Sequence, residues 1–356
     1  MPTIADRLFY FLTSLGHDAV VVFFVLSGYF VGGSVAGLIN KGRWSWQDYG
    51  IQRIVRLWTV LIPGLLLTAA WDELGLYNAT ARYYFPGAVS SQNAVVNQQL
   101  GIDALIGNVL FLQTILVPTY GSNGPLWSLA NEFWYYVLFP LIALTLWTRS
   151  GITGRVTCLV MALIILVWLP TNIVAAFGIW ILGYVAYEIS ISGKVPLIGS
   201  SRVVLLASSA LLLGSLTLRR LAPLSVSNLA AIAADYATAI LVAILIVGMT
   251  GRGNPPRAPL SGRISQMLAN SSYTLYVFHY PFCLFVASMW FCCDRFQPDS
   301  RSYAVLGLFV IGTWLYCFLM YLAFEARTDA IRASIRRWVR RRRPERLASP
   351  KGDSQQ

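Results

Sequence analysis

A run of twenty-two residues without a charged side chain, 19–40, constrains the fold more than any other part of the chain. At 1.5 Å of rise per residue, a helix of this length crosses a hydrocarbon core about 30 Å thick. Ser27, Gly28, Gly32 and Gly33 interrupt its apolar side chains, and small residues let helices approach closely inside a membrane. The run therefore predicts a membrane-spanning helix that packs against other helices.

Composition extends this prediction to most of the chain. Of its 356 residues, 56% are hydrophobic and 12% are charged, whereas charged residues make up about 25% of soluble proteins. The sequence predicts an all-α, polytopic membrane bundle with nine full spans and one short or re-entrant helix over 104–117. The longest polar loop is expected over 72–103. The expected spans are 15–40, 57–71, 126–147, a tight hairpin of two helices within 156–187, 203–218, 227–250, 266–291 and 302–325.

Basic residues predict the orientation of these spans. The net charge is +12, and nine of the 27 lysines and arginines lie between Arg327 and Arg346. Cytoplasmic segments are enriched in Lys and Arg, so we expect a transmembrane domain over 1–326 and a basic cytoplasmic tail over 327–356. Topology and anionic lipid headgroups account for the arginines, so no nucleic-acid partner is expected. The cysteines lack metal-ligand spacing, and no metal site is predicted.

Two polar groups lie where spans begin. His17 stands next to Asp18 at the start of the first span, where alternation of the spans from the cytoplasmic tail places it at the outer face. A histidine there is either a base near neutral pH or a polar residue that merely starts the helix. Arg53 and Arg56 are three residues apart and share one helical face. They suit the phosphates of a soluble donor, or they only mark the cytoplasmic end of a span.

Two further groups lie inside expected spans. Ser128 and Glu132 are one helical turn apart, and a carboxylate at membrane depth is costly, which favours a function over a structural polar pair. Tyr276 and His279 share a face of the 266–291 span, where the histidine is either functional or held by hydrogen bonds in a structural role. Asp235, inside the 227–250 span, has no surrounding motif. We interpret Asp235 as a possible structural partner.

The order of four segments is more specific than any one of them. FFVLSGY, RIVRLW, LWSLANE and SSYTLYVFHYP follow one another along the chain. This series resembles the membrane-bound acyltransferase 3 family, which includes O-antigen and exopolysaccharide O-acetylases, from about residue 16 to residue 325. The resemblance implies a multi-pass enzyme of the bacterial inner membrane. Such an enzyme moves an acyl group, usually acetyl, from acyl-CoA to a hydroxyl of a glycan or another extracytoplasmic acceptor, with no bound cofactor.

The resemblance also suggests roles for individual residues. Arg53 and Arg56 look like the family's paired arginines, which are associated with the acyl-CoA donor. Glu132 and His279 match its W-S-L-x-x-E and S-Y-x-x-Y-x-x-H-x-P elements and are candidate catalytic residues. His17 is not the counterpart of the histidine in the family's usual first helix, because it lies at the entry of the helix that normally follows, and it is a candidate base only through its position beside Asp18. The expected substrate pocket contains Ser27, Trp127, Ser128, Asn131 and Tyr276.

The sequence departs from the family at its N-terminal end, and several interpretations of its function remain open. Family members typically begin with an additional helix that carries an arginine and a later histidine, and we expect that helix to be missing before Gly16. Either the true start lies upstream, in which case this chain is a poor enzyme without the helix, or the usual base has been lost. The alternatives to an acyltransferase are a transporter or flippase of a polar or lipid-linked small molecule, and a non-catalytic relative. Transport predicts matching interruptions in two halves, and the sequence contains no convincing internal repeat.

Overall fold

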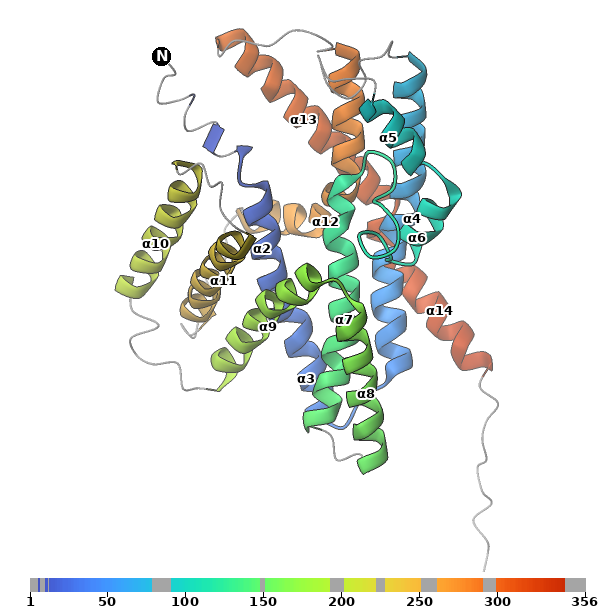
Figure 1. Ribbon diagram of the computed structural model, residues 1–356, viewed down its shortest axis with the longest axis vertical. Coiled ribbons are helices and arrows are strands. Elements are labelled where there is room, and N and C mark those ends of the chain that lie inside the picture. Colours follow the sequence, from blue (N-terminus) through green and yellow to red (C-terminus); the bar gives the residue numbers. More distant parts are fainter. Residues whose placement is uncertain are drawn as a thin grey trace, which may run out of the picture. The chain divides into compact units, whose positions relative to one another are not determined.

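The computed structural model describes nearly all of the expected spans. Within its described residues the chain forms helices and no strand, so the all-α prediction is confirmed (Figure 1). The contacts divide the chain into two compact units. The first unit is Met1–Trp44, Asn97–Ser265 and Arg295–Ala304, and the second is Ser45–Val96, Gln266–Asp294 and Val305–Gln356. The described residues are 6, 10–11, 13–78, 91–147, 151–192, 202–221, 228–250, 261–290 and 299–342.

The first unit contains the predicted first span as one continuous helical stretch. Its parts are α2 (Gly16–Ser27), the π-helical turn η1 (Gly28–Gly32) and α3 (Gly33–Asn40). The other elements of this unit are α6 (Ile102–Val109), η2 (Gly124–Leu126), α7 (Trp127–Trp147), α8 (Ile152–Trp168), α9 (Thr171–Ile191), α10 (Arg202–Leu221) and α11 (Asn228–Thr250). The predicted break inside 156–187 is confirmed, because only Leu169 and Pro170 separate α8 from α9, but a tight hairpin is not, because α8 packs mainly on α7 and α9 mainly on η1, α2 and α11.

Two glycines allow the first span to touch α9, which crosses it in Figure 1. A Cβ atom added to Gly28 would overlap the backbone carbonyl of Trp180, and one added to Gly183 would overlap that of Val25. Each helix therefore needs a glycine where it meets the backbone of the other. The close packing that the small residues predicted is present, and α9 is its partner.

The second unit is held together by aromatic side chains. It contains all or most of α4 (Trp46–Asn78), α5 (Ser91–Gln99), α12 (Ser261–Trp290), α13 (Ser300–Ala323), η3 (Glu325–Arg327) and α14 (Thr328–Arg342). The Trp71 indole of α4 donates a 3.0 Å hydrogen bond to the Tyr316 hydroxyl of α13. Phe282 of α12 stacks on the same tyrosine with a centroid distance of 4.1 Å. These contacts join three helices through one tyrosine.

Two predictions about the region between the second and third spans are wrong in part. The short helix expected over 104–117 ends at Val109, because Phe111 and Thr114 adopt positive φ values of 59° and 63° that a helix does not allow. The loop expected over 72–103 contains the end of α4 and all of α5. The apolar or polar character of the residues alone predicted neither the end of the helix at Val109 nor the helix α5. Residues 79–90 of that loop lie outside the described part of the chain.

The described residues contain six helical segments that are long and apolar enough to cross a membrane. They are Gly16–Asn40, Trp46–Tyr77, Gly124–Leu146, Thr171–Ile191, Leu229–Thr250 and Ser300–Val339. Two further apolar helices, Ile152–Trp168 and Val203–Thr217, are shorter. The chain is therefore a multi-pass membrane protein, while nine full spans remain a prediction. The expected tail includes α14, and its cytoplasmic location also remains a prediction.

The glycine contact between η1 and α9 leads to a stability test. Gly183→Ala places a Cβ atom against backbone that cannot rotate away, so we expect a loss of roughly 1–3 kcal/mol of folding free energy. Gly37→Ala is the matched control, because a Cβ atom there meets nothing within 4 Å. Thermal unfolding of the purified protein in detergent compares the two variants. Equal midpoints would show that the contact does not limit the packing.

Candidate functional site

A buried polar cluster lies in the first unit around Glu132, whose exposed fraction is 4%. The Ser27 hydroxyl donates a 2.9 Å hydrogen bond to Oε1 of Glu132, and the Tyr136 hydroxyl donates to the same oxygen. The Trp180 indole donates to the Ser27 hydroxyl oxygen at 3.1 Å. The four side chains come from α2, α7 and α9. The structure thus brings together Ser27 and Glu132, which belong to separate sequence motifs.

The hydrogen bonds of this cluster run in one direction. The indole of Trp180 can only donate, the Ser27 hydroxyl accepts from it and donates in turn, and Glu132 accepts at the end of the series. Oε1 of Glu132 can accept both hydrogen bonds in the ionised carboxylate and in the neutral acid. Hydrogen bonds to a charged group are stronger than neutral ones, which offsets part of the cost of burial.

Helix geometry explains which residues join the cluster. Tyr136 lies one turn after Glu132 on α7 and therefore faces the same side. Ser128, one turn before Glu132, is buried at 2% exposure. Trp180 was not predicted, because a tryptophan in an uncharged helix gives no functional signal in the sequence. Its position follows from the close packing of α9 on η1 at Gly28.

Asn131 adds an acceptor on the same helix. Its side chain is 2% exposed, and its Oδ1 atom has no hydrogen-bond partner among the described residues. Buried polar atoms normally have a partner, and leaving one without costs roughly 1–3 kcal/mol. This oxygen is suited to receive a hydrogen bond from a hydroxylated ligand or from water, in keeping with the predicted pocket role of Asn131.

His17 lies at the start of α2 in the same unit and contacts two other helices. Its Nε2 atom is 3.1 and 3.0 Å from the two carboxylate oxygens of Asp235 on α11. Its ring stacks on Trp127 of α7, with centroids 6.5 Å apart and an interplanar angle of 17°. Two predicted site residues, His17 and Trp127, are thus in contact. No sequence motif links either residue to Asp235.

His279 belongs to the second unit and is anchored to its own helix. Its Nδ1 atom lies 2.8 Å from the Leu275 carbonyl oxygen and 3.0 Å from that of Tyr276. A carbonyl oxygen only accepts, so Nδ1 carries the hydrogen, and in the neutral ring Nε2 is the acceptor. The Tyr276 ring is 6.3 Å from the imidazole, centroid to centroid. The predicted pairing of these two residues on one face is confirmed.

The two arginines of the second unit differ in their surroundings. Arg53 is buried at 8% exposure, with its guanidinium carbon 5.4 Å from the centre of the Tyr49 ring. Arg56 is exposed. It lies within electrostatic range of Glu325, which accepts a 3.1 Å hydrogen bond from the Thr274 backbone N–H. The three-residue spacing placed them near one face of α4, but only Arg56 presents its charge to the surroundings.

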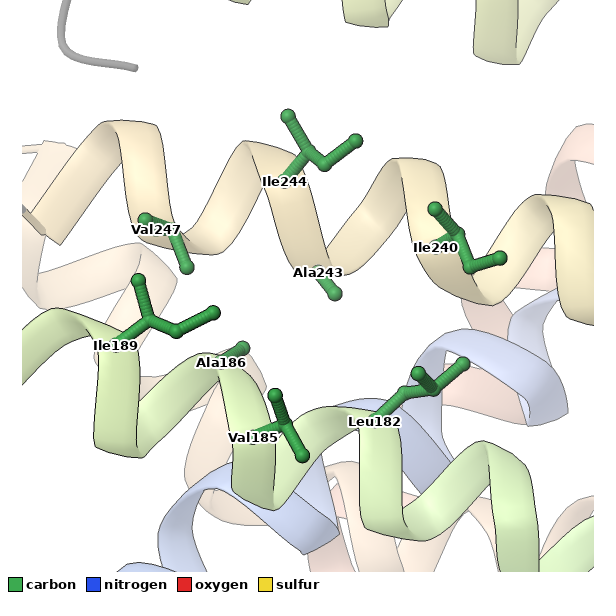
Figure 2. A pocket seen from close by; sticks show the side chains of 8 residues that line it. All are labelled: Leu182, Val185, Ala186, Ile189, Ile240, Ala243, Ile244 and Val247. Carbon is green, nitrogen blue, oxygen red and sulfur yellow. The ribbon is translucent and has the colours of Figure 1, made fainter. Parts of the chain in front are cut away.

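An apolar groove between α9 and α11 is visible in Figure 2 and has a volume of about 300 Å³. The eight side chains that line it carry no polar group. It therefore offers no acid, base or hydrogen-bond donor for a reaction. Its lining residues are Leu182, Val185, Ala186, Ile189, Ile240, Ala243, Ile244 and Val247.

Membrane-length helices around a buried, hydrogen-bonded carboxylate define a polytopic membrane protein with a polar site among its helices. The acyltransferase 3 family model, described as an acyltransferase domain, matches residues 2–324. The chain belongs to this family, and the resemblance drawn from its motifs is confirmed. No curated protein and no solved structure matches the chain.

The cluster leads to a prediction about Ser27. Ser27→Ala removes one donor from the buried Glu132 carboxylate and the acceptor of the Trp180 indole. We expect the variant to lose roughly 1–3 kcal/mol of folding free energy, because a buried polar group then lacks a partner. Ser34→Ala, in the exposed position seven residues later, is the control. Thermal unfolding in one detergent compares them, and a Ser27→Ala midpoint equal to that of the control would contradict the network.

Proposed function

We propose that the protein is a membrane O-acyltransferase of the bacterial inner membrane. It moves an acyl group, acetyl in the simplest case, from acyl-CoA to a hydroxyl of a glycan or another extracytoplasmic acceptor. The observation that carries this proposal is the family match over residues 2–324, which covers almost all of the described helices. Acyl-CoA acts as a substrate, and the proposal includes no bound cofactor.

The reaction needs a base for the acceptor hydroxyl. As the hydroxyl oxygen bonds to the thioester carbonyl carbon, the base removes its proton, and the carbon–sulfur bond then breaks to release the CoA thiolate. General-base catalysis of this kind contributes about 10²–10⁴-fold to the rate. The chain has two histidines. In the neutral form of each ring, the hydrogen bonds of His17 and His279 engage one nitrogen as donor and leave the other as acceptor.

The Glu132 cluster is suited to the acceptor. Its carboxylate already accepts hydrogen bonds from a serine and a tyrosine hydroxyl, and a sugar hydroxyl is the same kind of donor. The unpartnered Oδ1 atom of Asn131, one residue before Glu132 on α7, is a second acceptor. We therefore assign to this cluster the positioning of the hydroxylated acceptor.

Transport is the second candidate function, because buried carboxylates in membrane helices also occur in proton-coupled pathways. One assay separates the two. Purified protein in lipid nanodiscs is incubated with acetyl-CoA, and the release of CoA thiol is measured with and without a bacterial surface-glycan extract. Acceptor-dependent thiol release supports acyl transfer. If no acceptor-dependent thiol release occurs and the glycan or its lipid-linked precursor is taken up into proteoliposomes, the acyltransferase proposal is overturned in favour of transport.

We expect Glu132→Gln to lower acyl transfer at least about tenfold, because the amide keeps the shape but removes the charge that orders the hydroxyl donors. Glu73→Gln, an exposed carboxylate on α4, is the matched control. Acetylation of the glycan is measured with both variants at equal protein level in membranes. If Glu132→Gln matches the control, the charge has no catalytic or positioning role.

The donor proposal concerns Arg56 alone of the two arginines. Arg56→Ala removes an exposed cation and is expected to raise the KM for acetyl-CoA about tenfold or more, since a charge-assisted contact to phosphate is worth about 1.5–3 kcal/mol. The inhibition constant of desulfo-CoA, used as a competitive inhibitor, should rise by the same factor in the Arg56→Ala variant. Arg337→Ala, an exposed arginine of α14, is the control. An unchanged KM in a folded Arg56→Ala variant would reduce the residue to a topology marker.

A further inference from the structure

Asp235 is a carboxylate within α11, in a helix segment of mean hydropathy 2.3. A charge inside such a helix is costly unless a partner compensates it. The partner in the structure is His17, 218 residues away in the sequence, and α11 packs directly on α2. The sequence alone gave Asp235 no role beyond a possible structural one. Its contact with a candidate base raises the question of what the pair does.

The contact of His17 with Asp235 fixes the orientation of the ring and the tautomer of its neutral form. The Asp235 carboxylate accepts the Nε2 hydrogen, which leaves the lone pair of the neutral ring on Nδ1. The Trp127 indole lies nearly parallel to the imidazole, at an angle of 17° and a centroid distance of 6.5 Å. Two neighbouring helices thus hold the ring from two sides. In a catalytic triad, a carboxylate orients the histidine base in the same way.

Exposure separates the two members of the pair. The His17 side chain is 50% exposed, whereas that of Asp235 is 17% exposed. The imidazole is therefore within reach of a substrate while the carboxylate is largely covered. This difference suits a histidine that touches the substrate and an aspartate that acts only through the histidine.

The other histidine lacks this support. His279 is held by the carbonyl oxygens of Leu275 and Tyr276, both in its own helix. A carbonyl group fixes the tautomer, but it carries no full charge to stabilise the imidazolium that a base becomes. Of the two histidines, His17 has the partner that a base needs.

We propose that His17 is the base of the acyl transfer and that Asp235 is its positioning residue, an inference that rests on the proposed function. Nδ1 of His17 takes the proton of the acceptor hydroxyl as the hydroxyl oxygen bonds to the carbonyl carbon of the thioester. The carbon–sulfur bond breaks, and the imidazolium, paired with Asp235, returns the proton to the CoA thiolate. The products are the acyl ester and CoA thiol.

The first test reads the pair without any reaction. With only two histidines in the chain, ¹⁵N-histidine labelling gives two imidazole spin systems in the full-length protein in nanodiscs, and His279→Gln assigns them. We expect the His17 signals to show hydrogen on Nε2 and those of His279 to show hydrogen on Nδ1. Asp235→Asn should change the ¹⁵N shifts of His17 and leave those of His279 unchanged. Unchanged His17 shifts would overturn the pairing.

The second test reads the reaction. We expect His17→Gln to lower kcat by about 10²–10⁴-fold, the usual contribution of a general base, with the KM for acetyl-CoA changed less than about threefold. Asp235→Asn should lose at least about tenfold in kcat, and Asp235→Glu, which keeps a carboxylate, should recover most of that loss. Asp329→Asn, an exposed aspartate of α14 that pairs with Arg332, is the matched control. Recovery by glutamate separates a role of the charge from a loss of folding.

The outcomes distinguish this inference from the function on which it rests. A wild-type protein without acceptor-dependent thiol release overturns the proposed function, and the catalytic role of the pair with it. An active wild type whose Asp235→Asn variant keeps its kcat overturns the inference alone, even if the His17 signals move. Loss of kcat in His279→Gln with full activity in His17→Gln would assign the base to His279 instead.

Discussion

The cost of placing carboxylates among apolar helices governs how the helices of each unit meet. Glu132 is met by hydroxyls from α2 and from its own helix, and Glu325 by the backbone and hydroxyl of Thr274. Asp235 is met by His17. Apolar contacts between membrane helices resemble those with lipid tails and specify partners poorly. These three acids therefore add specific contacts between α2 and α7, between α2 and α11 and between α12 and η3, and Glu132 and Asp235 also take part in the chemistry proposed for the protein.

In the proposed enzyme, the first unit combines two different polar environments. The Glu132 cluster is buried, and hydrogen bonds from Ser27 and Tyr136 converge on one carboxyl oxygen. The His17 ring is half exposed and pairs with a carboxylate that can stabilise a positive charge formed during a reaction. A glycan acceptor needs both a site that holds it and a base that deprotonates its reacting hydroxyl. Ser27 and His17 are ten residues apart on α2, about 15 Å along its axis, so the two environments suit different hydroxyls of one acceptor.

The sequence predicted features that depend on local spacing. The first span, the break at Pro170 and the shared face of Tyr276 and His279 follow from helix periodicity and turn residues. Contacts between distant segments did not follow, because neither His17 nor Asp235 carries information about the other. Helical spacing also predicted one environment for Arg53 and Arg56, although a 60° difference around α4 suffices to bury the first and expose the second. Tertiary packing decides such differences.

The contact of Gly28 with Trp180, and of Gly183 with Val25, has a consequence for the alignment of the polar groups. Where two backbones touch, neither helix can slide by one residue, because the next position would bring a side chain into a space that holds none. The two glycines therefore determine the register of the helices that places Ser27 opposite Trp180. The register of the two helices depends on the glycine pair and not on the polar side chains. Polar residues along these helices can therefore change during evolution, and new sites can arise at the same crossing, while the register is kept.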